Sequence, residues 1–176
     1  GFQATNEEEV KDIRLHILKH AEVVVVPNLS RKAAAQVKPI VKEAGAVKLV
    51  SVARIAVEKN TLWAIGSLRQ VKGHVRFNLY GPVYDEAYWA KCQAAIAALP
   101  AHVEVNHAGT LPPEDVPEVL AEHHALFMPS AGENFGHTML EALSAGRPLL
   151  ISDRTPWRGL EQDHAGWDLP LDRPAG

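Results

Sequence analysis

The stretch formed by residues 127–146 contains two glutamates, Glu133 and Glu141. Glu133 lies in a glycine-containing loop, and Glu141 lies in the segment that follows this loop. This stretch begins with an apolar run typical of a strand and ends with a helix-forming segment. In an open parallel sheet, ligands bind at the carboxyl ends of the strands, where a loop entering a helix offers unpaired backbone N–H groups. We therefore expect a phosphate to bind at residues 135–138.

The two glutamates would bracket the rest of such a ligand. Glu141 follows Gly136 by five residues, or roughly 7.5 Å along a helix that rises about 1.5 Å per residue. Its carboxylate could accept both vicinal hydroxyls of a ribose attached to the phosphate, while Glu133 would face the other end of a diphosphate. The alternative is that Glu133 complements the helix dipole and Glu141 is an exposed helical residue. The first interpretation predicts a nucleotide-sugar site.

Arg54 and Lys59 supply two cations after an earlier apolar run. They lie five residues apart, directly after residues 48–53 and before a helix-forming segment. A guanidinium and an ammonium group at the carboxyl end of another strand could neutralise a diphosphate. The alternative is a surface ion pair of either cation with Glu58, and the sequence leaves both interpretations open.

Several common sites are missing from the sequence. It contains neither G-x-G-x-x-G nor G-x-x-x-x-G-K-[ST], which argues against a dehydrogenase and a P-loop NTPase. Ser130 follows a strand as a hydrolase nucleophile does, but Met128 stands where the first glycine of that turn is required. His137 and Glu141 share a helical face, yet two ligands do not make a metal site. No Asp-x-Asp pair is present to hold a divalent ion against a diphosphate.

Short apolar runs alternate with longer helix-forming segments, which predicts an α/β fold with a parallel sheet. Most of the runs are rich in Val, Leu and Phe with little polar alternation, as strands covered on both faces should be. The expected strands are residues 22–26, 48–53, 75–80, 103–106, 125–128 and 148–151, and the expected helices are residues 6–20, 32–44, 61–72, 85–99, 113–123 and 136–145. This order sets the cations and the glutamates at the carboxyl ends of two strands.

The composition excludes several other classes of protein. The 176 residues are 47% hydrophobic and 22% charged, which suits a globular domain with a sizeable core. The longest apolar runs are far shorter than the roughly 20 residues that cross a bilayer. A net charge of −3 gives no basic surface for nucleic acid, so nucleic acid is not an expected partner. The single cysteine, Cys92, cannot form an intrachain disulfide, which suits a reducing compartment.

Taken together, these motifs resemble the C-terminal, donor-binding domain of retaining GT-B glycosyltransferases of the family 4 type. That family has an R-x4-K loop, a Gly-Pro turn, an aliphatic strand ending in Gly, and then P-S-x-x-E-x-F-G-x-x-x-x-E-A-x-x-x-G-x-P. This chain has the same pieces in the same order, from Arg54 to Lys59, at Gly81-Pro82, and over residues 103–109 and 129–148. The resemblance covers about residues 1–170, and residues 155–161 with Gly166-Trp167 resemble a subgroup of bacterial transferases.

The resemblance implies a role for each matching residue. Arg54 and Lys59 would bind the donor diphosphate and stabilise the leaving group, and Glu133 would hold sugar hydroxyls beside the reacting carbon; these three are the expected catalytic residues. The amides around Gly136 would cradle phosphate, and Glu141 would bind the ribose. The expected contacts to the nucleotide sugar are Arg54, Lys59, Gly81, Thr110, Leu111, Glu133, Asn134, Phe135, Gly136, His137, Thr138 and Glu141, with Gly81 as a turn close to the donor and Thr110 and Leu111 as backbone contacts to the base.

Two residues depart from the family pattern. Asn60 and Asn134 stand where the family has glycine. Asparagine tolerates a left-handed backbone better than other residues that carry a side chain, so we expect both loops to keep their course.

The implied fold is a Rossmann-like open parallel sheet with helices on both faces, one half of a GT-B two-domain enzyme. Residues 1–27 would lead from the first domain, and residues 28–176 would form the nucleotide-sugar donor-binding domain. The implied reaction transfers a hexosyl group, with retention and without a metal or other cofactor, from a UDP- or GDP-sugar to a hydroxyl of a glycan, lipid or small molecule. Bacterial polysaccharide or glycoconjugate biosynthesis uses such reactions. The isolated domain should be nearly inactive because it lacks the acceptor domain.

Two other functions stay open. Nucleotide-sugar 2-epimerases share the two-domain GT-B architecture, and they would yield epimerised donor without an acceptor product. A non-catalytic nucleotide-binding module would bind nucleotide without turnover. Residue 1 is not Met, so we expect the sequence to lie within a longer chain. The expected location is the cytoplasm, with attachment of the full-length protein to the inner face of the membrane left open.

Overall fold

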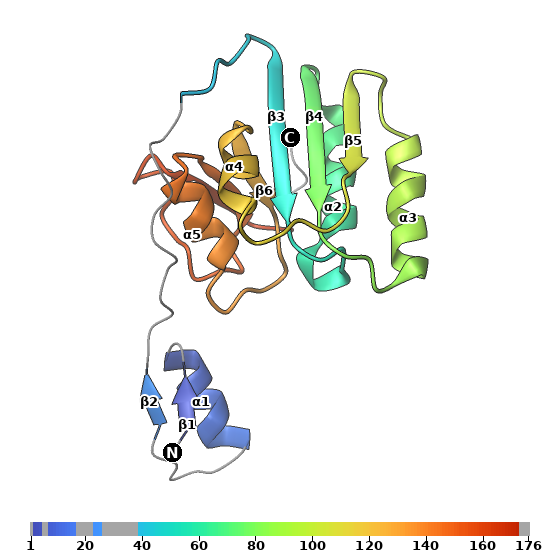
Figure 1. Cartoon of the computed structure of the whole chain (residues 1–176). Helices are drawn as coiled ribbons and strands as arrows, with labels where there is room; N and C mark the ends of the chain where they lie inside the picture. Colours follow the sequence, from blue (N-terminus) through green and yellow to red (C-terminus); the bar gives the residue numbers. More distant parts are fainter. Residues whose placement is uncertain (1, 5–6, 17–22, 26–38, 173–176) are drawn as a thin grey trace. The chain divides into compact units, whose positions relative to one another are not determined.

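A computed structural model describes residues 2–4, 7–16, 23–25 and 39–172 of the chain (Figure 1). The chain divides into two compact units, Gly1–Lys32 and Ala33–Gly176. The boundary predicted between residues 27 and 28 lies outside the described residues, as do residues 5–6, 17–22, 26–38 and 173–176.

The first unit holds two short strands and one helix. β1 (Phe2–Ala4) pairs in parallel with β2 (Val23–Val25). α1 (Glu7–His16) lies between them in the chain. The sequence predicted the helix and β2 but not β1, because a run of three residues with a polar centre carries no strand signal of its own.

Six parallel strands form the sheet of the second unit, in the order β5-β4-β3-β6-β7-β8. They are β3 (Ala46–Val52), β4 (His74–Tyr80), β5 (Val103–His107), β6 (Ala125–Met128), β7 (Leu149–Ser152) and β8 (Gly166–Leu169). The chain starts at the centre, runs outward to β5, and then returns to the other side of β3 to add β6, β7 and β8. The order of the strands therefore reverses between β3 and β6, which is where open α/β sheets bind ligands.

Helices cover both faces of this sheet (Figure 1). α2 (Thr61–Ser67), which the 3₁₀ turn Leu68–Gln70 extends, and α3 (Glu86–Ala97) share one buried core with the sheet. α4 (Val116–Ala121) and α5 (His137–Ser144) share the other. Leu49 belongs to the first core and its neighbour Val50 to the second, so apolar residues are needed on both sides of β3. The Rossmann-like parallel sheet that the sequence predicted is confirmed.

One predicted element of the second unit is wrong, and one of its strands was not predicted. Residues 39–44, the described part of the helix expected over 32–44, are not helical. Proline inside a helix lacks a backbone donor and clashes with the carbonyl four residues earlier, and the six residues from Pro39 to the left-handed Gly45 (φ 78°) are too few for a stable helix of their own. β8 was not expected, because Gly166–Leu169 alternates polar and apolar residues over only four positions; its register with β7 makes it a strand.

No helix within the described ranges is long and apolar enough to cross a lipid bilayer.

Candidate functional site

Two loops meet where the strand order reverses. The loop after β3 leads through the 3₁₀ turn Val57–Lys59 into α2, and the loop after β6 leads into α5. Ala131 N donates a hydrogen bond to Glu58 O at 2.8 Å, and Thr138 Oγ1 donates to Val52 O at 3.2 Å. Because β3 and β6 are parallel neighbours, segments far apart in the chain share one edge of the sheet.

Lys59 and Glu133 form an ion pair between these loops. Lys59 Nζ lies 2.5 Å from Glu133 Oε1, and the two side chains are only 19% and 12% exposed. Ser130 Oγ donates to the same oxygen at 3.1 Å. Ser130 is fully buried, and its carbonyl accepts a hydrogen bond from the Ser152 hydroxyl. Both donors contact Oε1 of Glu133, and a carboxylate has a second oxygen that can also accept hydrogen bonds.

The hydroxyl of Ser130 therefore has a different partner from that of a hydrolase nucleophile. Its hydroxyl hydrogen is directed to a carboxylate that itself sits against an ammonium group. This arrangement agrees with the expectation that Ser130 is not a nucleophile, and it makes the hydroxyl a support for Glu133.

Arg54 lies on the loop after β3, the loop that also carries Lys59. Its Nη2 is 2.6 Å from Glu58 Oε1, and both side chains are about half exposed. The sequence left two interpretations of these cations open, a diphosphate site and a surface ion pair with Glu58. Arg54 forms the surface ion pair, whereas Lys59 instead contacts Glu133. Solvent screens the exposed pair, so its net energy is small and Arg54 can exchange Glu58 for another anion at little cost.

The left-handed residue between Lys59 and α2 is an asparagine. Asn60 has φ 58° and ends the 3₁₀ turn while starting α2. The tolerance expected at the family's glycine position is confirmed there. Asn134 does not need it, since Asn60 and His164 are the non-glycine residues with positive φ in the described part of the chain.

Gly136 begins α5 in a left-handed conformation, with φ 77°. A Cβ at this position would lie 2.7 Å from Met139 Sδ and 3.2 Å from Trp157 Nε1, so a larger residue would be strained and crowded. The first hydrogen bond of the helix runs from Met139 N to Gly136 O. The N–H groups of His137 and Thr138 thus precede the helical ladder and carry the positive end of its dipole, as expected for a phosphate cradle.

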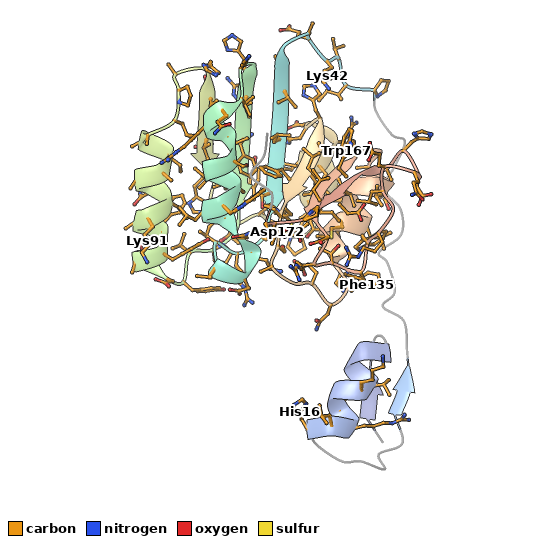
Figure 2. The ribbon with its side chains drawn as sticks, turned by 180° about the vertical axis from the view of Figure 1, so that it is seen from behind. His16, Lys42, Lys91, Phe135, Trp167 and Asp172 are labelled. Carbon is orange, nitrogen blue, oxygen red and sulfur yellow. The ribbon has the colours of Figure 1, made fainter. Side chains whose placement is uncertain are left out.

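Phe135 lies just before this cradle, on the loop that leads into α5 (Figure 2). Its ring centroid is 4.8 Å from that of the exposed His137 and 6.3 Å from that of Trp157. Trp157 Nε1 donates a hydrogen bond to Phe135 O at 2.7 Å. The sequence assigned no role to Trp157 beyond its place in residues 155–161, which resemble a subgroup of bacterial transferases. A second signal was its position shortly after β7, whose carboxyl end lies beside that of β6.

The other predicted residues lie at the same edge of the sheet. Gly81 follows β4 and is buried, with φ 145°; a Cβ there would lie 2.0 Å from Ala53 O, which explains why glycine is needed. Gly81 N donates to Gly109 O at 2.8 Å, which ties the loops after β4 and β5 together. Thr110 is exposed and Leu111 packs against the α4/α5 core.

The structure joins only some of the predicted residues directly. Lys59 and Glu133 are in contact, whereas none of the hydrogen bonds in the described ranges links Gly81, Thr110 or Leu111 to either of them. Glu141 is half-buried in the second turn of α5. Among the described residues, no group of three or more His, Cys, Asp or Glu side chains could hold a metal ion.

Burial shifts the pKa values of three groups in the core. Burial raises the pKa of the Cys92 thiol and of the neighbouring Tyr88 hydroxyl, which keeps both protonated. Burial lowers the pKa of His123, whose Nδ1 lies 2.6 Å from Val119 O and whose Nε2 lies 2.8 Å from Asn78 Nδ2. These groups support the fold, and Cys92 is not a reactive thiol.

The chain belongs to the family described as Glycosyl transferases group 1, whose model matches residues 30–167. The matched range contains the carboxyl ends of all the strands that frame the site, including the loop that carries Trp157. No curated protein matches the chain.

Solved structures of glycosyltransferases share the fold. A glycosyltransferase from Rickettsia africae ESF-5 has a TM-score of 0.75 at 14% identity, covering 98% of this chain and 50% of that chain. Sucrose-phosphate synthase from Thermosynechococcus elongatus has a TM-score of 0.74 at 17% identity, covering 98% of this chain and 45% of that chain. S. aureus TarM, solved as a variant with Fondaparinux, alpha-GlcNAc-glycerol and UDP, has a TM-score of 0.66 at 17% identity, covering 97% and 34%. The chain thus has the Rossmann-like fold of one half of a GT-B glycosyltransferase and spans half or less of the length of these proteins.

Proposed function

We propose that this chain is the donor-binding domain of a glycosyltransferase that takes a hexosyl group from a UDP- or GDP-sugar. The observation that carries the proposal is the Lys59–Glu133 ion pair at the reversal of the strand order, beside the start of α5. A cation, a carboxylate and helix-terminal N–H groups together offer partners for the diphosphate and the hydroxyls of a nucleotide sugar. UDP is the first nucleotide to test, because the structurally similar S. aureus TarM was solved with it.

Each feature has a role in the proposed site. The Lys59 ammonium carries three donors, so it can keep Glu133 and bind a diphosphate oxygen at the same time. Arg54 would leave Glu58 to bind the same diphosphate. Glu133 Oε2 would accept from a hydroxyl of the sugar. The remaining contacts proposed are Gly81, Thr110, Leu111, Asn134, Phe135, Gly136, His137, Thr138 and Glu141, with the carboxylate of Glu141 on the ribose.

The proposed reaction replaces the bond between the sugar and the diphosphate by a bond to an acceptor hydroxyl, with retention at the anomeric carbon. Negative charge develops on the departing nucleoside diphosphate. Lys59, Arg54 and the N–H groups at the start of α5 would stabilise that charge, which allows the reaction to proceed without a metal. Glu133 would position the sugar, and no side chain is assigned as a nucleophile.

The rest of the enzyme completes the proposal. An N-terminal domain would bind the acceptor, which is a glycan, a lipid or a small molecule, and residues 1–27 would lead from it into the donor domain. This chain alone would then bind the donor with little turnover. We place the enzyme in the cytoplasm, where it would meet its nucleotide-sugar substrate.

Calorimetry with nucleotides and nucleosides tests the proposal. We expect this chain to bind UDP or GDP much more tightly than the matching nucleoside. Lys59→Ala and Arg54→Ala should weaken binding of the diphosphate far more than binding of the nucleoside, because only the diphosphate contacts the cations. Arg76→Ala is the control, since Arg76 is an exposed cation already paired with Glu104. Equal losses for diphosphate and nucleoside would refute the assignment of the two cations.

A further inference from the structure

The loop after β7 reaches the proposed phosphate cradle through one side chain. Trp157 Nε1 donates its only hydrogen to Phe135 O, with a donor–acceptor distance of 2.7 Å. Phe135 immediately precedes Gly136, the residue that begins α5. Trp157 is therefore one peptide unit away from the N–H groups that the proposed function assigns to the diphosphate.

Hydrogen bonds and burial hold the turn that carries Trp157 in place. Its backbone N donates to the hydroxyl of the buried Thr155 at 3.2 Å. On the other side of the turn, the Asp168 carboxylate on β8 accepts from Gly159 N at 3.3 Å and from Leu160 N at 3.0 Å. Leu160 is buried in the α4/α5 core. Both ends of the turn are thus tied to the sheet or its core, so the indole can fix the position of its partner.

The peptide bond transmits this constraint to the cradle. A trans peptide is planar, so the carbonyl of Phe135 and the N–H of Gly136 point in opposite directions. Holding the carbonyl toward Trp157 therefore aims the Gly136 N–H away from the indole. Gly136 also leaves room for the indole, because a Cβ there would lie 3.2 Å from Trp157 Nε1.

We propose that Trp157 is a positioning residue for the donor diphosphate: its indole N–H holds the Phe135 carbonyl and thereby orients the backbone N–H of Gly136 at the entrance to α5. This inference rests on the proposed function. It differs from a structural role in what it predicts, because loss of the indole N–H should weaken binding of the diphosphate and leave binding of the nucleoside unchanged.

The test compares Trp157→Phe with Trp167→Phe in this chain by calorimetry with UDP and uridine, or GDP and guanosine if GDP is the nucleotide bound. Trp157→Phe keeps an aromatic ring and removes the N–H donor. We expect diphosphate affinity to fall about ten-fold, the loss of roughly one hydrogen bond, and nucleoside affinity to change less than about two-fold. Trp167 is 44% exposed on β8, and its replacement should change neither affinity (Figure 2).

The outcomes separate the two proposals. A wild-type chain that binds neither diphosphate more tightly than its nucleoside overturns the proposed function. A wild-type chain that prefers the diphosphate, with a Trp157→Phe variant that keeps the same preference, overturns the role of Trp157 alone. If circular dichroism shows that Trp157→Phe is unfolded, Trp157→Met takes its place, since it also removes the indole N–H and its flexible side chain adapts to the space that the indole leaves. An unchanged diphosphate preference in that variant also overturns the role.

Discussion

Lys59 Nζ lies 2.5 Å from Glu133 Oε1, although the two residues are 74 positions apart in the chain. The contact exists because β3 and β6 are neighbours in the sheet and both run in the same direction. Their carboxyl ends therefore deliver a cation and a carboxylate to one point. With both side chains largely shielded from water, solvent and salt screen this pair much less than a surface ion pair.

A double-mutant cycle should show that Lys59 and Glu133 are energetically coupled. We expect Lys59→Met and Glu133→Gln each to lower the free energy of unfolding. The loss in the double variant should be smaller than the sum of the two single losses by about 1 to 2 kcal/mol. The reason is that either single change leaves one buried charge without its partner. Urea unfolding of the four proteins measures the coupling.

Arg76 and Glu104 provide the matched control for this cycle. Their side chains are 56% and 64% exposed at a distance of 3.1 Å. Because water screens this pair, Arg76→Met and Glu104→Gln should be additive to within about 0.5 kcal/mol. Additivity at Lys59 and Glu133 as well would show that their ion pair does not stabilise the fold.

Glu58→Gln should strengthen binding of the nucleoside diphosphate about two- to five-fold. Glu58 holds Arg54 at 2.6 Å in the free protein, and an exposed ion pair of this kind costs up to about 1 kcal/mol to break. Removing the carboxylate frees the guanidinium for the diphosphate. Calorimetric titration of the variant measures the gain.

The Arg54→Ala background separates this effect from a general loss of negative charge. If Arg54 is the residue that is freed, Glu58→Gln should gain much less in that background. A gain of the same size with and without Arg54 would mean that Glu58 acts on the ligand directly by repulsion.

Gly136→Ala should lower the free energy of unfolding by about 1 to 2 kcal/mol, since the residue has φ 77° and L side chains are strained in the left-handed region. The new Cβ would also crowd Met139 Sδ at 2.7 Å. Gly132→Ala is the control within the same loop, because a Cβ there meets nothing within 4 Å. It should change stability by less than about 0.5 kcal/mol. Equal losses at the two glycines would contradict the strain argument.

The stability of the fold should fall as the pH falls below about 6.5, in part because of His123. Val119 O can only accept, so Nδ1 carries the proton and Nε2 accepts from the Asn78 amide. Burial lowers the pKa of His123 below 6.5 in the folded chain, so the unfolded chain binds a proton first as the pH falls. His123 therefore contributes its full stabilisation above about pH 6.5. This stabilisation is lost as the pH falls toward and through the lower pKa of His123 in the folded chain.

His123→Asn tests this account. Unfolding free energies measured between about pH 8 and pH 5.5 should fall less steeply in the variant than in the wild-type chain, although the variant is less stable at pH 8. An unchanged slope would mean that His123 does not contribute to the pH dependence of stability.

Much of the fold could be predicted from the sequence because each of β3 to β7 buries apolar residues. β6 and β7 are apolar runs, as expected for strands covered on both faces. β4 and β5 instead alternate between buried and more exposed residues, so the expectation of two covered faces is wrong for them. β8 is too short and too polar to be recognised, since it depends on its pairing with β7. Residues 39–44 are not helical for a local reason, because Pro39 and the left-handed Gly45 leave too few residues between them for a helix.

The candidate site divides in the same way. The residue types and the loops that hold them were predictable, including Lys59, Glu133 and Gly136. The partners were not. Arg54 and Glu58 were one of two open interpretations, and Ser130 as a support for Glu133 was not foreseen. Trp157 received no role, because nothing in its local sequence indicates a contact with Phe135.

The sequence by itself determined that apolar strands would end in loops carrying cations, carboxylates and glycines, because alternation of elements and turn chemistry are local properties. Only the tertiary structure decided which of these residues meet. The order of the strands places β3 beside β6 and β6 beside β7, so Lys59 reaches Glu133 and Trp157 reaches Phe135. Arg54, whose partner is four residues away, finds it within its own loop. Contacts between distant segments depend on strand pairing across the whole sheet, and no local pattern encodes that.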